Sequence, residues 1–301
     1  MPYNLCDLLS DFLQNHSRPR KRTFHRDQRM AQRILADIGN PPVQKLTVAA
    51  LRTWHASTGE KHGHYEANRQ LALLRAAINK CDDWDQPNPA RRVTPFAEQQ
   101  RDRFLSAAEL ERLNIALDSP ATKRGYADFI HLSLFCGARK SNTAAMRWDQ
   151  LDLDAATWRI PPEASKNGRT MLIPLCPQAL SILAHRRGLF PDSPWVFPGR
   201  STSGHMIDRR CAWRDLLRRA ELADFRIHDL RRTLGSYMAI GGASLPIIGK
   251  ALGHQSQQTT QIYARLSLAP VRAGIAAATD AMMGTPKPPE PPKQYFMRYA
   301  G

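Results

Sequence analysis

The stretch DDWDQPNPARRVTPF, residues 82–96, divides the sequence into two parts. It contains three prolines and shows no sustained hydrophobic period. Proline lacks an amide hydrogen and disfavours helical dihedrals in the residue before it, so this composition indicates the end of one domain and the start of a linker. We therefore expect a domain over residues 1–93, a linker over 94–104 and a second domain over 105–283.

Before this stretch, the sequence predicts four short helices. Apolar residues at helical spacing occur between Leu5 and Ile38 and are interrupted by the basic run RPRKR at 18–22, which predicts two helices around a positive segment. Thr47 is a candidate N-cap for the next helix, and EANRQLALLRAAINK at 66–80 carries an apolar stripe on one face.

After the proline-rich stretch, the sequence is again mainly helical. Ser106 followed by Glu109 is a capping-box pattern that begins a helix. In residues 157–175, β-branched and aromatic residues flank Lys166-Asn167-Gly168, which predicts a hairpin with this tripeptide at its tip. Further helices are expected over 208–222, 228–240 and 267–283. Residues 284–301 are proline-rich and are expected to form an extended tail, so the predicted fold class is mainly α with a small antiparallel β-sheet.

The charge of the chain favours a polyanionic partner. Lys and Arg total 43 against 27 Asp and Glu, a formal net charge of +16, which is typical of proteins that bind nucleic acid. No apolar run approaches the roughly 18 residues of a membrane span, so no membrane partner is expected.

The five cysteines are scattered and never form a C-x-x-C pair. This argues against a disulfide framework or a zinc site, and for a reducing, cytoplasmic location. His62 and His64 lack a third ligand, and we expect neither a metal nor a cofactor.

Four separated motifs together suit chemistry on a phosphodiester. They are GARK at 137–140, SKNG at 165–168, HDLRRT at 228–233 and LGHQSQQTTQIY at 252–263. Two arginines can hold a phosphate through bidentate hydrogen bonds and stabilise its transition state, a Lys or His can protonate a leaving oxygen, and a hydroxyl can form a covalent intermediate. Each motif alone is weak, because such residues are also common in packing and solvated surfaces.

In their order and spacing these motifs resemble the tyrosine recombinases, also called phage integrases. The resemblance implies an N-terminal four-helix, SAM-like core-binding domain and a C-terminal catalytic domain. It implies that Tyr263 attacks the scissile phosphate to give a 3′-phosphotyrosyl link, without metal or ATP. The implied catalytic set is Arg139, Lys166, His228, Arg231, His254 and Tyr263. One departure is Asn142, which stands where the family often has an acidic residue three positions after the first arginine.

The resemblance also implies the partners: double-stranded DNA attachment sites, a homotetramer on paired sites, and accessory DNA-bending proteins. The activity expected first is integration or excision of a mobile element. Phosphate contacts supply most affinity for DNA, so we expect basic residues of the first domain to make them. The candidates are Arg18, Arg20, Lys21, Arg22, Arg69 and Arg75. Residues 66–80 are the expected groove-reading helix, and YFMRY in the tail is expected to dock on a neighbouring subunit.

Three other readings remain open. A type IB topoisomerase would use nearly the same chemistry but would relax DNA instead of joining two sites. A rolling-circle nuclease would need a His-hydrophobe-His pair and a metal, whereas here the middle residue of HGH is Gly63. A catalytically inactive DNA-binding regulator on the same scaffold would keep the fold and lose the reaction.

Overall fold

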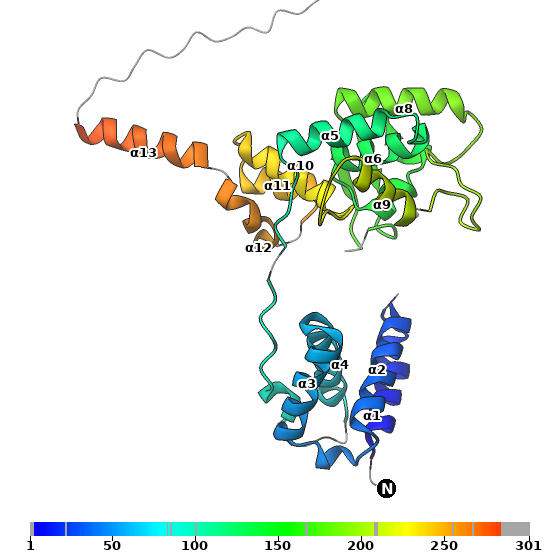
Figure 1. The fold of residues 1–301 in the computed structure, drawn as a ribbon, viewed down its shortest axis with the longest axis vertical. Helices are drawn as coiled ribbons and strands as arrows, with labels where there is room; N and C mark the ends of the chain where they lie inside the picture. The colour runs from blue at the N-terminus through cyan, green and yellow to red at the C-terminus, as the bar shows by residue number, and fades with distance from the viewer. Residues whose placement is uncertain are drawn as a thin grey trace, which may run out of the picture. The chain divides into compact units, whose positions relative to one another are not determined.

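The computed structural model describes residues 3–21, 23–82, 84, 86–99, 101–165, 168–207, 210–254, 256–266 and 268–283 (Figure 1). The chain divides into two compact units, Met1–Arg101 and Asp102–Gly301, which we call the first unit and the second unit. The division falls inside the segment that the sequence predicts as a linker. The predicted tail, residues 284–301, lies outside the described residues.

The first unit is helical, as the sequence predicts. Its elements are α1 (Leu5–Asp11), the π-helix η1 (Phe12–Ser17), α2 (Phe24–Ile38), the 3-10 helix η2 (Val43–Lys45), α3 (Val48–His62), α4 (His64–Asn79) and the 3-10 helix η3 (Pro89–Arg92). The hydroxyl of Thr47 accepts a hydrogen bond from the amide of Ala50 at 3.2 Å, which confirms the predicted cap of α3. Gly63 has a φ of +86° and reverses the chain between α3 and α4, a conformation that favours glycine.

The fourth helix, α4, is the centre of the first unit. It packs against α1, α2 and α3, and Leu71 and Leu74 on α4 are fully buried with Leu5, Ile34 and Leu51. Burying one such side chain contributes about 1.5–3 kcal/mol, so this core holds the four helices together.

Phe96 anchors the start of the predicted linker to the first unit. Its ring stacks between His55 and His64, with ring centroids 4.5 Å and 4.0 Å away. The side chain of Asn68 accepts from the amide of Phe96 at 2.9 Å and donates to its carbonyl at 2.9 Å. A Cβ at Gly59 would lie 2.6 Å from the ring of Phe96, so glycine makes room for it. The phenylalanine is therefore held by both its backbone and its ring.

The second unit contains a three-stranded sheet among helices. The elements before α10 are α5 (Ala107–Asp118), α6 (Arg124–Cys136), α7 (Lys140–Ala144), η4 (Trp148–Gln150), β1 (Leu151–Asp152), β2 (Thr157–Ile160), β3 (Met171–Pro174), α8 (Pro177–Leu189) and α9 (Arg210–Arg219). The remaining elements are α10 (Asp229–Ile240), α11 (Leu245–Leu252), α12 (Gln257–Thr260), the 3-10 helix η5 (Gln261–Leu266) and α13 (Leu268–Met283). The capping box of Ser106 and Glu109 is present at the start of α5 and confirms that prediction.

The sheet has the order β1-β2-β3 and is antiparallel throughout. Trp158 pairs with Ile173, so β2 and β3 form the predicted hairpin. The sequence did not predict β1, because two residues are too few to show a period of two.

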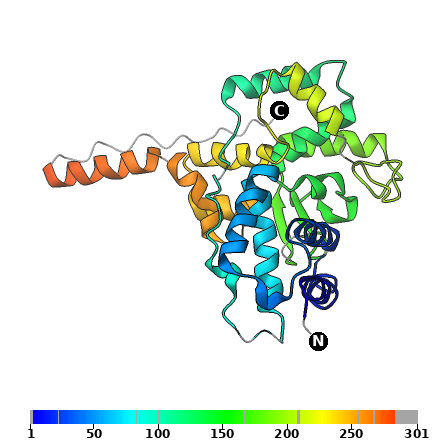
Figure 2. The ribbon, with the colours of Figure 1, turned by 60° about the horizontal axis from the view of Figure 1, so that its bottom comes forward.

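The core of the second unit lies between the sheet and its helices. Phe129, Trp158 and Phe197 are among its fully buried side chains. Beside them, Arg186 on α8 donates to the carboxylate of Asp128 on α6 at 3.2 Å, and both side chains are buried. Figures 1 and 2 show α10 beside α11, with α12 and η5 following, and the packing of α10 on α11 and η5 places the ends of these elements together.

Candidate active site

Arg231 joins the ends of three helices. It lies in the first turn of α10 and is 5% exposed. Its guanidinium donates to the carbonyl of Gly137 at 2.5 Å and to the carbonyl of Leu252. Gly137 is the C-cap of α6 and Leu252 is the last residue of α11, and helix ends carry carbonyls without partners inside the helix. One guanidinium therefore caps two helices, and the residues that follow both helix ends are brought next to it.

Arg139 follows the first of these helix ends. Gly137 has a φ of +56°, and a Cβ there would lie 2.7 Å from Leu234 and 2.9 Å from Leu252, so glycine is needed for this turn. Two residues later, Arg139 is half-buried at the N-cap of α7. Burial, and then the charge of Arg139, lower the pKa of Arg231 to about 10. The guanidinium of Arg231 therefore stays charged at neutral pH, as a phosphate clamp requires.

His254 follows the second helix end. Gly253 has a φ of +59° and turns the chain after α11. The Nδ1 atom of His254 lies 3.0 Å from the hydroxyl of Thr260, which fixes the orientation of the imidazole. Partial burial, and then the charges of Arg231 and Arg139, lower the pKa of His254 to about 4. The imidazole is therefore neutral at pH 7.

His228 lies at the N-cap of α10, three residues before Arg231. The residue is exposed overall, but its ring is partly desolvated. This desolvation and the charges of Arg231 and Arg232 lower the pKa of His228 below its usual value. Like His254, it can take part in proton transfer as a neutral base.

Tyr263 lies in η5 and is 3% exposed. Its ring is parallel to that of His254, with centroids 6.5 Å apart. Burial raises the pKa of Tyr263, while Arg231 and Arg232 lower it by less. The neighbouring cations favour ionisation of this phenol, but the loss of solvent has the larger effect on its pKa.

Lys166 and Asn167 lie outside the described residues. The hairpin that carries them does reach the site, since a Cβ at Gly253 would lie 2.5 Å from the sulfur of Met171 on β3. Asn142 is buried in α7, one turn after Arg139. Its backbone N–H donates to the carbonyl of Arg139 at 2.8 Å, so this residue helps to form the turn that carries the arginine.

The predicted DNA-binding residues of the first unit differ in their surroundings. Arg75 is half-buried and donates to the carbonyls of Ala90 and Val93, which is a structural role. Arg69 forms an ion pair with Glu98 at 3.3 Å, and its guanidinium lies over Tyr65. The middle of α4 is buried on most sides, so this helix offers few side chains to a DNA groove.

The basic segment between η1 and α2 is better exposed. Arg18 donates to Gln14, Arg20 donates to the carbonyl of Asn15, and Lys21 pairs with the buried Asp27 at 2.6 Å. Arg22 lies outside the described residues.

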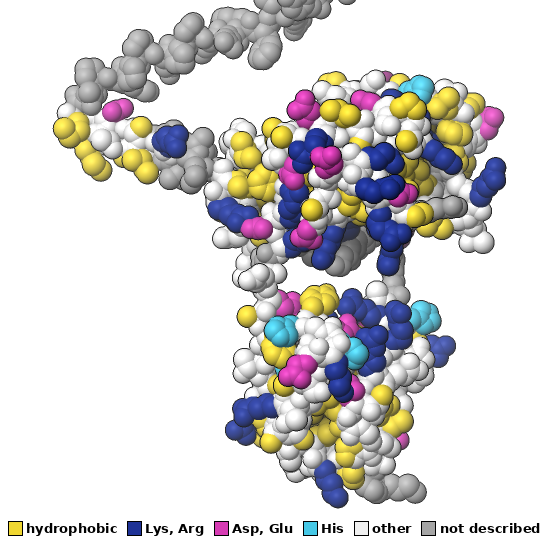
Figure 3. All heavy atoms as spheres, in the orientation of Figure 1, with side chains coloured by type: hydrophobic (Ala, Val, Ile, Leu, Met, Phe, Trp, Pro, Cys, Tyr) yellow, Lys and Arg dark blue, Asp and Glu magenta, His cyan; other side chains and the backbone are white. Residues whose placement is uncertain are grey.

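The sequence interpretation missed a basic row on α2. Arg26, Arg29 and Arg33 are exposed at positions i, i+3 and i+7, a spacing that puts them on one face and that is visible in the sequence. Arg33 pairs with Glu66 at 2.9 Å, whereas no ion pair among the described residues involves Arg26 or Arg29. Figure 3 shows Lys and Arg side chains gathered on the first unit where α2 begins.

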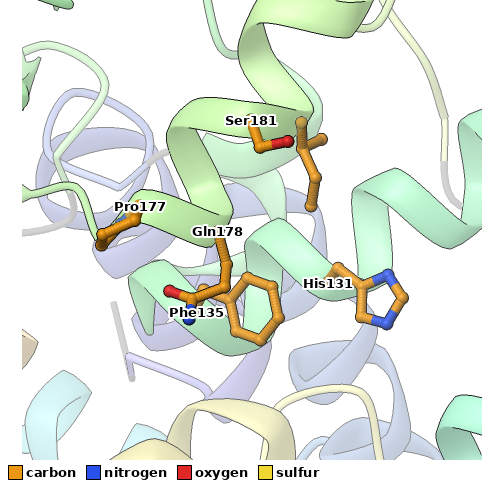
Figure 4. A pocket seen from close by; sticks show the side chains of 6 residues that line it. His131, Phe135, Pro177, Gln178 and Ser181 are labelled. Atoms are coloured by element: carbon orange, nitrogen blue, oxygen red, sulfur yellow. The ribbon is translucent and has the colours of Figure 1, made fainter. Parts of the chain in front are cut away.

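Away from these residues, an open groove of about 450 Å³ lies between α6 and α8 (Figure 4). It is lined by His131, Phe135, Pro177, Gln178, Ser181 and Ile182, none of which belongs to the predicted catalytic set.

Within the described part of the chain, no three His, Cys, Asp or Glu side chains are grouped so that they could hold a metal ion. No described helix is long and apolar enough to cross a membrane.

Comparisons with known proteins identify the family of this chain. A model of the phage integrase family matches residues 103–269, more than half of the chain. The integrase of Salmonella phage P22 is 29% identical over 239 residues, which cover 75% of this chain and 57% of that protein. Tyrosine recombinase XerD of Caulobacter vibrioides is 31% identical over 203 residues, which cover 62% of this chain and 65% of that protein. The chain thus spans less than two thirds of the length of these relatives.

Among solved structures, a lambda integrase tetramer bound to a Holliday junction matches with a TM-score of 0.69 and 16% identity. The match covers 86% of this chain and 76% of that one. At this identity the similarity shows a shared fold.

Proposed function

Because the chain belongs to the phage integrase family, we propose that it is a site-specific DNA recombinase that cuts and rejoins strands through a tyrosine. One observation carries the proposal. Arg231 caps the ends of α6 and α11 together. This places Arg139, His228 and His254 close enough for their charges to affect one another. Tyr263 lies beside them.

The proposed reaction is a transesterification at phosphorus. The phenol oxygen of Tyr263 forms a bond to the phosphorus, the bond from phosphorus to the 5′ oxygen breaks, and a 3′-phosphotyrosyl link and a free 5′-hydroxyl result. Lys166 gives a proton to the leaving oxygen, and His228 accepts the proton of the phenol. Arg139 and Arg231 stabilise the added charge on the phosphate, and His254 donates a hydrogen bond to it.

Arg231 can serve as both a brace and a phosphate ligand. A guanidinium has five N–H donors in a planar fork, and two of its hydrogen bonds go to main-chain carbonyls. The remaining donors are available to a phosphate that enters beside Arg139. The braced side chain is already ordered, so binding a phosphate costs it little further rotamer freedom.

The phosphotyrosyl link preserves the energy of the broken bond, so the 5′-hydroxyl of a partner strand can reseal it without ATP. Exchange between two duplexes breaks four strands, and one tyrosine per strand requires four copies of the chain. The lambda integrase tetramer on a Holliday junction supports this assembly. We propose integration and excision of a mobile element as the purpose, which the similarity to the phage P22 integrase supports. Accessory DNA-bending proteins belong to the same proposal.

DNA recognition by the first unit is proposed to use α2 and the basic segment before it. The fifteen residues of α2 span about 22 Å, a length that fits along a major groove. Its exposed face carries Arg26, Arg29 and Arg33 together with Gln28 and Gln32. Arg and Gln are side chains that read base edges, and Arg18 and Arg20 lie nearby to contact phosphates. Arg69 remains a candidate for phosphate contact once its pair with Glu98 opens.

The test needs no knowledge of the target site. Duplexes with a randomised core and a nick at a fixed position inside it are mixed with the protein. In the molecules that are cut shortly before the nick, the short 5′-hydroxyl fragment diffuses away and the covalent complex accumulates. Protein-linked DNA is isolated on a denaturing gel and sequenced. We expect a covalent complex with an enriched core sequence, unaffected by chelation of divalent metal.

Tyr263→Phe should abolish this complex, whereas Tyr237→Phe, a matched change of an exposed tyrosine on α10, should not. A complex that persists in Tyr263→Phe would overturn the assignment of the nucleophile. Once a core sequence is known, joining of two such sites distinguishes recombination from relaxation of a supercoil, the result expected of a type IB topoisomerase.

A further inference from the structure

The basic segment between η1 and α2 is held by a buried aspartate. Asp27 is in the first turn of α2, and its side chain is 7% exposed. Its Oδ2 atom accepts a hydrogen bond from the hydroxyl of Ser17 at 2.7 Å and another from the ammonium of Lys21 at 2.6 Å. Ser17 is fully buried, whereas the side chain of Lys21 is 44% exposed. One carboxylate therefore ties two points of the chain to α2.

Main-chain hydrogen bonds make this segment a tight turn. The amides of Arg20 and Lys21 both donate to the carbonyl of Ser17, at 3.2 Å and 2.8 Å. The amide of Phe24, the first residue of α2, donates to the carbonyl of Lys21 at 3.2 Å. The turn therefore has a defined shape, and the contacts with Asp27 fasten it to the body of the helix.

The arginines of the turn remain at the surface. Arg18 and Arg20 are exposed, and their side-chain hydrogen bonds go to residues of η1. Arg26 and Arg29 are exposed on α2, before and after Asp27 in the sequence. Because Asp27 connects the turn to α2, it fixes the two pairs of arginines relative to each other. The phosphates of a duplex are regularly spaced, so a fixed array of cations binds them at a lower entropic cost than a mobile array.

The charge of Asp27 is unfavourable for a surface that binds DNA. A carboxylate repels phosphates, and this one also occupies the ammonium of Lys21. If the surface acted only through its total positive charge, replacing Asp27 by a neutral residue would strengthen binding to every duplex. A neutral side chain would hold the turn less firmly, because hydrogen bonds to a charged group are roughly twice as strong as neutral ones.

We propose that Asp27 is a positioning residue for DNA recognition. By binding Ser17 and Lys21, it fixes the arginines of the turn relative to those of α2. Lys21 then acts as the partner of Asp27 and not as a phosphate ligand. The inference rests on the proposed function of the first unit in DNA recognition, and it adds a requirement for one acidic residue within a basic surface.

The experiment compares two substitutions that change the charge of α2 equally. Asp27→Asn removes the carboxylate that holds the turn. Asp37→Asn is the matched control, because it removes a carboxylate from the last turn of the same helix, where Asp37 pairs with Lys61 at 3.6 Å. If Asp27→Asn does not fold, Lys21→Gln takes its place, since it breaks the same ion pair from the more exposed side.

Order in the turn is measured first, by hydrogen exchange and mass spectrometry of the free protein. We expect the amides of Arg20, Lys21 and Phe24 to exchange about tenfold faster in Asp27→Asn than in the wild type. In Asp37→Asn they should exchange at the wild-type rate. Equal exchange in the two folded variants overturns the proposal. This measurement needs no DNA, so it does not depend on the proposed recombinase function.

Recognition is measured second, as the ratio of the affinity for a duplex with the enriched core sequence to the affinity for a scrambled duplex. The added charge affects both duplexes alike and cancels in this ratio. We expect the ratio to fall about tenfold in Asp27→Asn and to stay at the wild-type value in Asp37→Asn.

An unchanged ratio in Asp27→Asn overturns the proposal, and tighter binding to both duplexes would then show that Asp27 only reduces the charge of the surface. A different result separates this proposal from the proposed function. Faster exchange in Asp27→Asn, together with a wild-type protein that selects no core sequence, would support the role of Asp27 in the turn and contradict the proposed recombinase function.

Discussion

Replacing Arg231 by Lys should weaken the second unit as well as slow the reaction. The buried guanidinium donates to the carbonyls of Gly137 and Leu252. A hydrogen bond that involves a charged group contributes about 1.5–3 kcal/mol, and a lysine ammonium can replace one of the two at most. We therefore expect the free energy of unfolding to fall by about 2–3 kcal/mol. In a unit of this size, that corresponds to a decrease in Tm of roughly 5–10 °C.

The assay is a thermal or urea titration followed by tryptophan fluorescence. Four of the six tryptophans, Trp148, Trp158, Trp195 and Trp213, lie in the second unit, so its unfolding dominates the signal. Arg232→Lys is the matched control, because Arg232 is 25% exposed and its ion pair with Asp229 can be kept by lysine. The control should change the free energy of unfolding by less than about 1 kcal/mol.

The same variant should form the covalent complex about 10²–10³ times more slowly, the usual cost of losing one donor to a developing oxyanion. If Arg231→Lys unfolds at the same midpoint as Arg232→Lys, the claim that one guanidinium holds two helix ends together is refuted. If only cleavage were lost, Arg231 would bind the phosphate without holding the ends of α6 and α11 together.

Three further predictions follow from the charges of the two units. The pKa of His254 is lowered from 6.5 in the unfolded chain to about 4, so its neutral ring contributes stability that is fully present above pH 6.5 and is lost as the pH falls toward 4. After discounting for partial exposure, this loss is roughly 1–2 kcal/mol, and His254→Asn should flatten the dependence of Tm on pH in that window. Asp102→Asn removes the exposed ion pair to Arg265 and should lower the free energy of unfolding by less than about 1 kcal/mol in a urea titration, with the difference from wild type shrinking in high salt. Arg29→Ala should weaken DNA binding and reduce the slope of log K against log salt concentration by about one, which filter binding at several salt concentrations can check. The control is Lys45→Ala, in η2 beyond the other end of α2, which should leave the slope unchanged.

The sequence predicted the elements that follow from local rules. The caps at Thr47 and Ser106 and the hairpin around residues 157–175 depend on neighbours within a few positions, and the structure contains each of them. The family motifs could likewise be read from spacing alone, and the family comparison confirms the resemblance.

What the sequence could not give depends on burial. The raised pKa of Tyr263 results from loss of solvent, which outweighs the neighbouring arginines that the sequence does reveal. In the sequence, Arg75 looks like an exposed arginine that could contact DNA. In the structure, its guanidinium donates hydrogen bonds to main-chain carbonyls 15 and 18 residues further along the chain. The ring of Tyr263 packs against Gly235, which lies 28 residues earlier in the chain, and no periodic sequence pattern predicts this contact.

The docking of Phe96 has a practical consequence for building chimeric recombinases. If the first unit were transplanted onto the second domain of a relative with sequence alone as the guide, it would be cut at its composition boundary, near residue 93. Such a cut would leave Asn68, His55 and His64 facing a foreign segment without the aromatic ring and the peptide group they hold. The transferable module extends through Glu98, which accepts a hydrogen bond from Asn68. A junction within residues 99–101 should therefore preserve the grafted module, whereas a junction near residue 93 should lower its melting temperature.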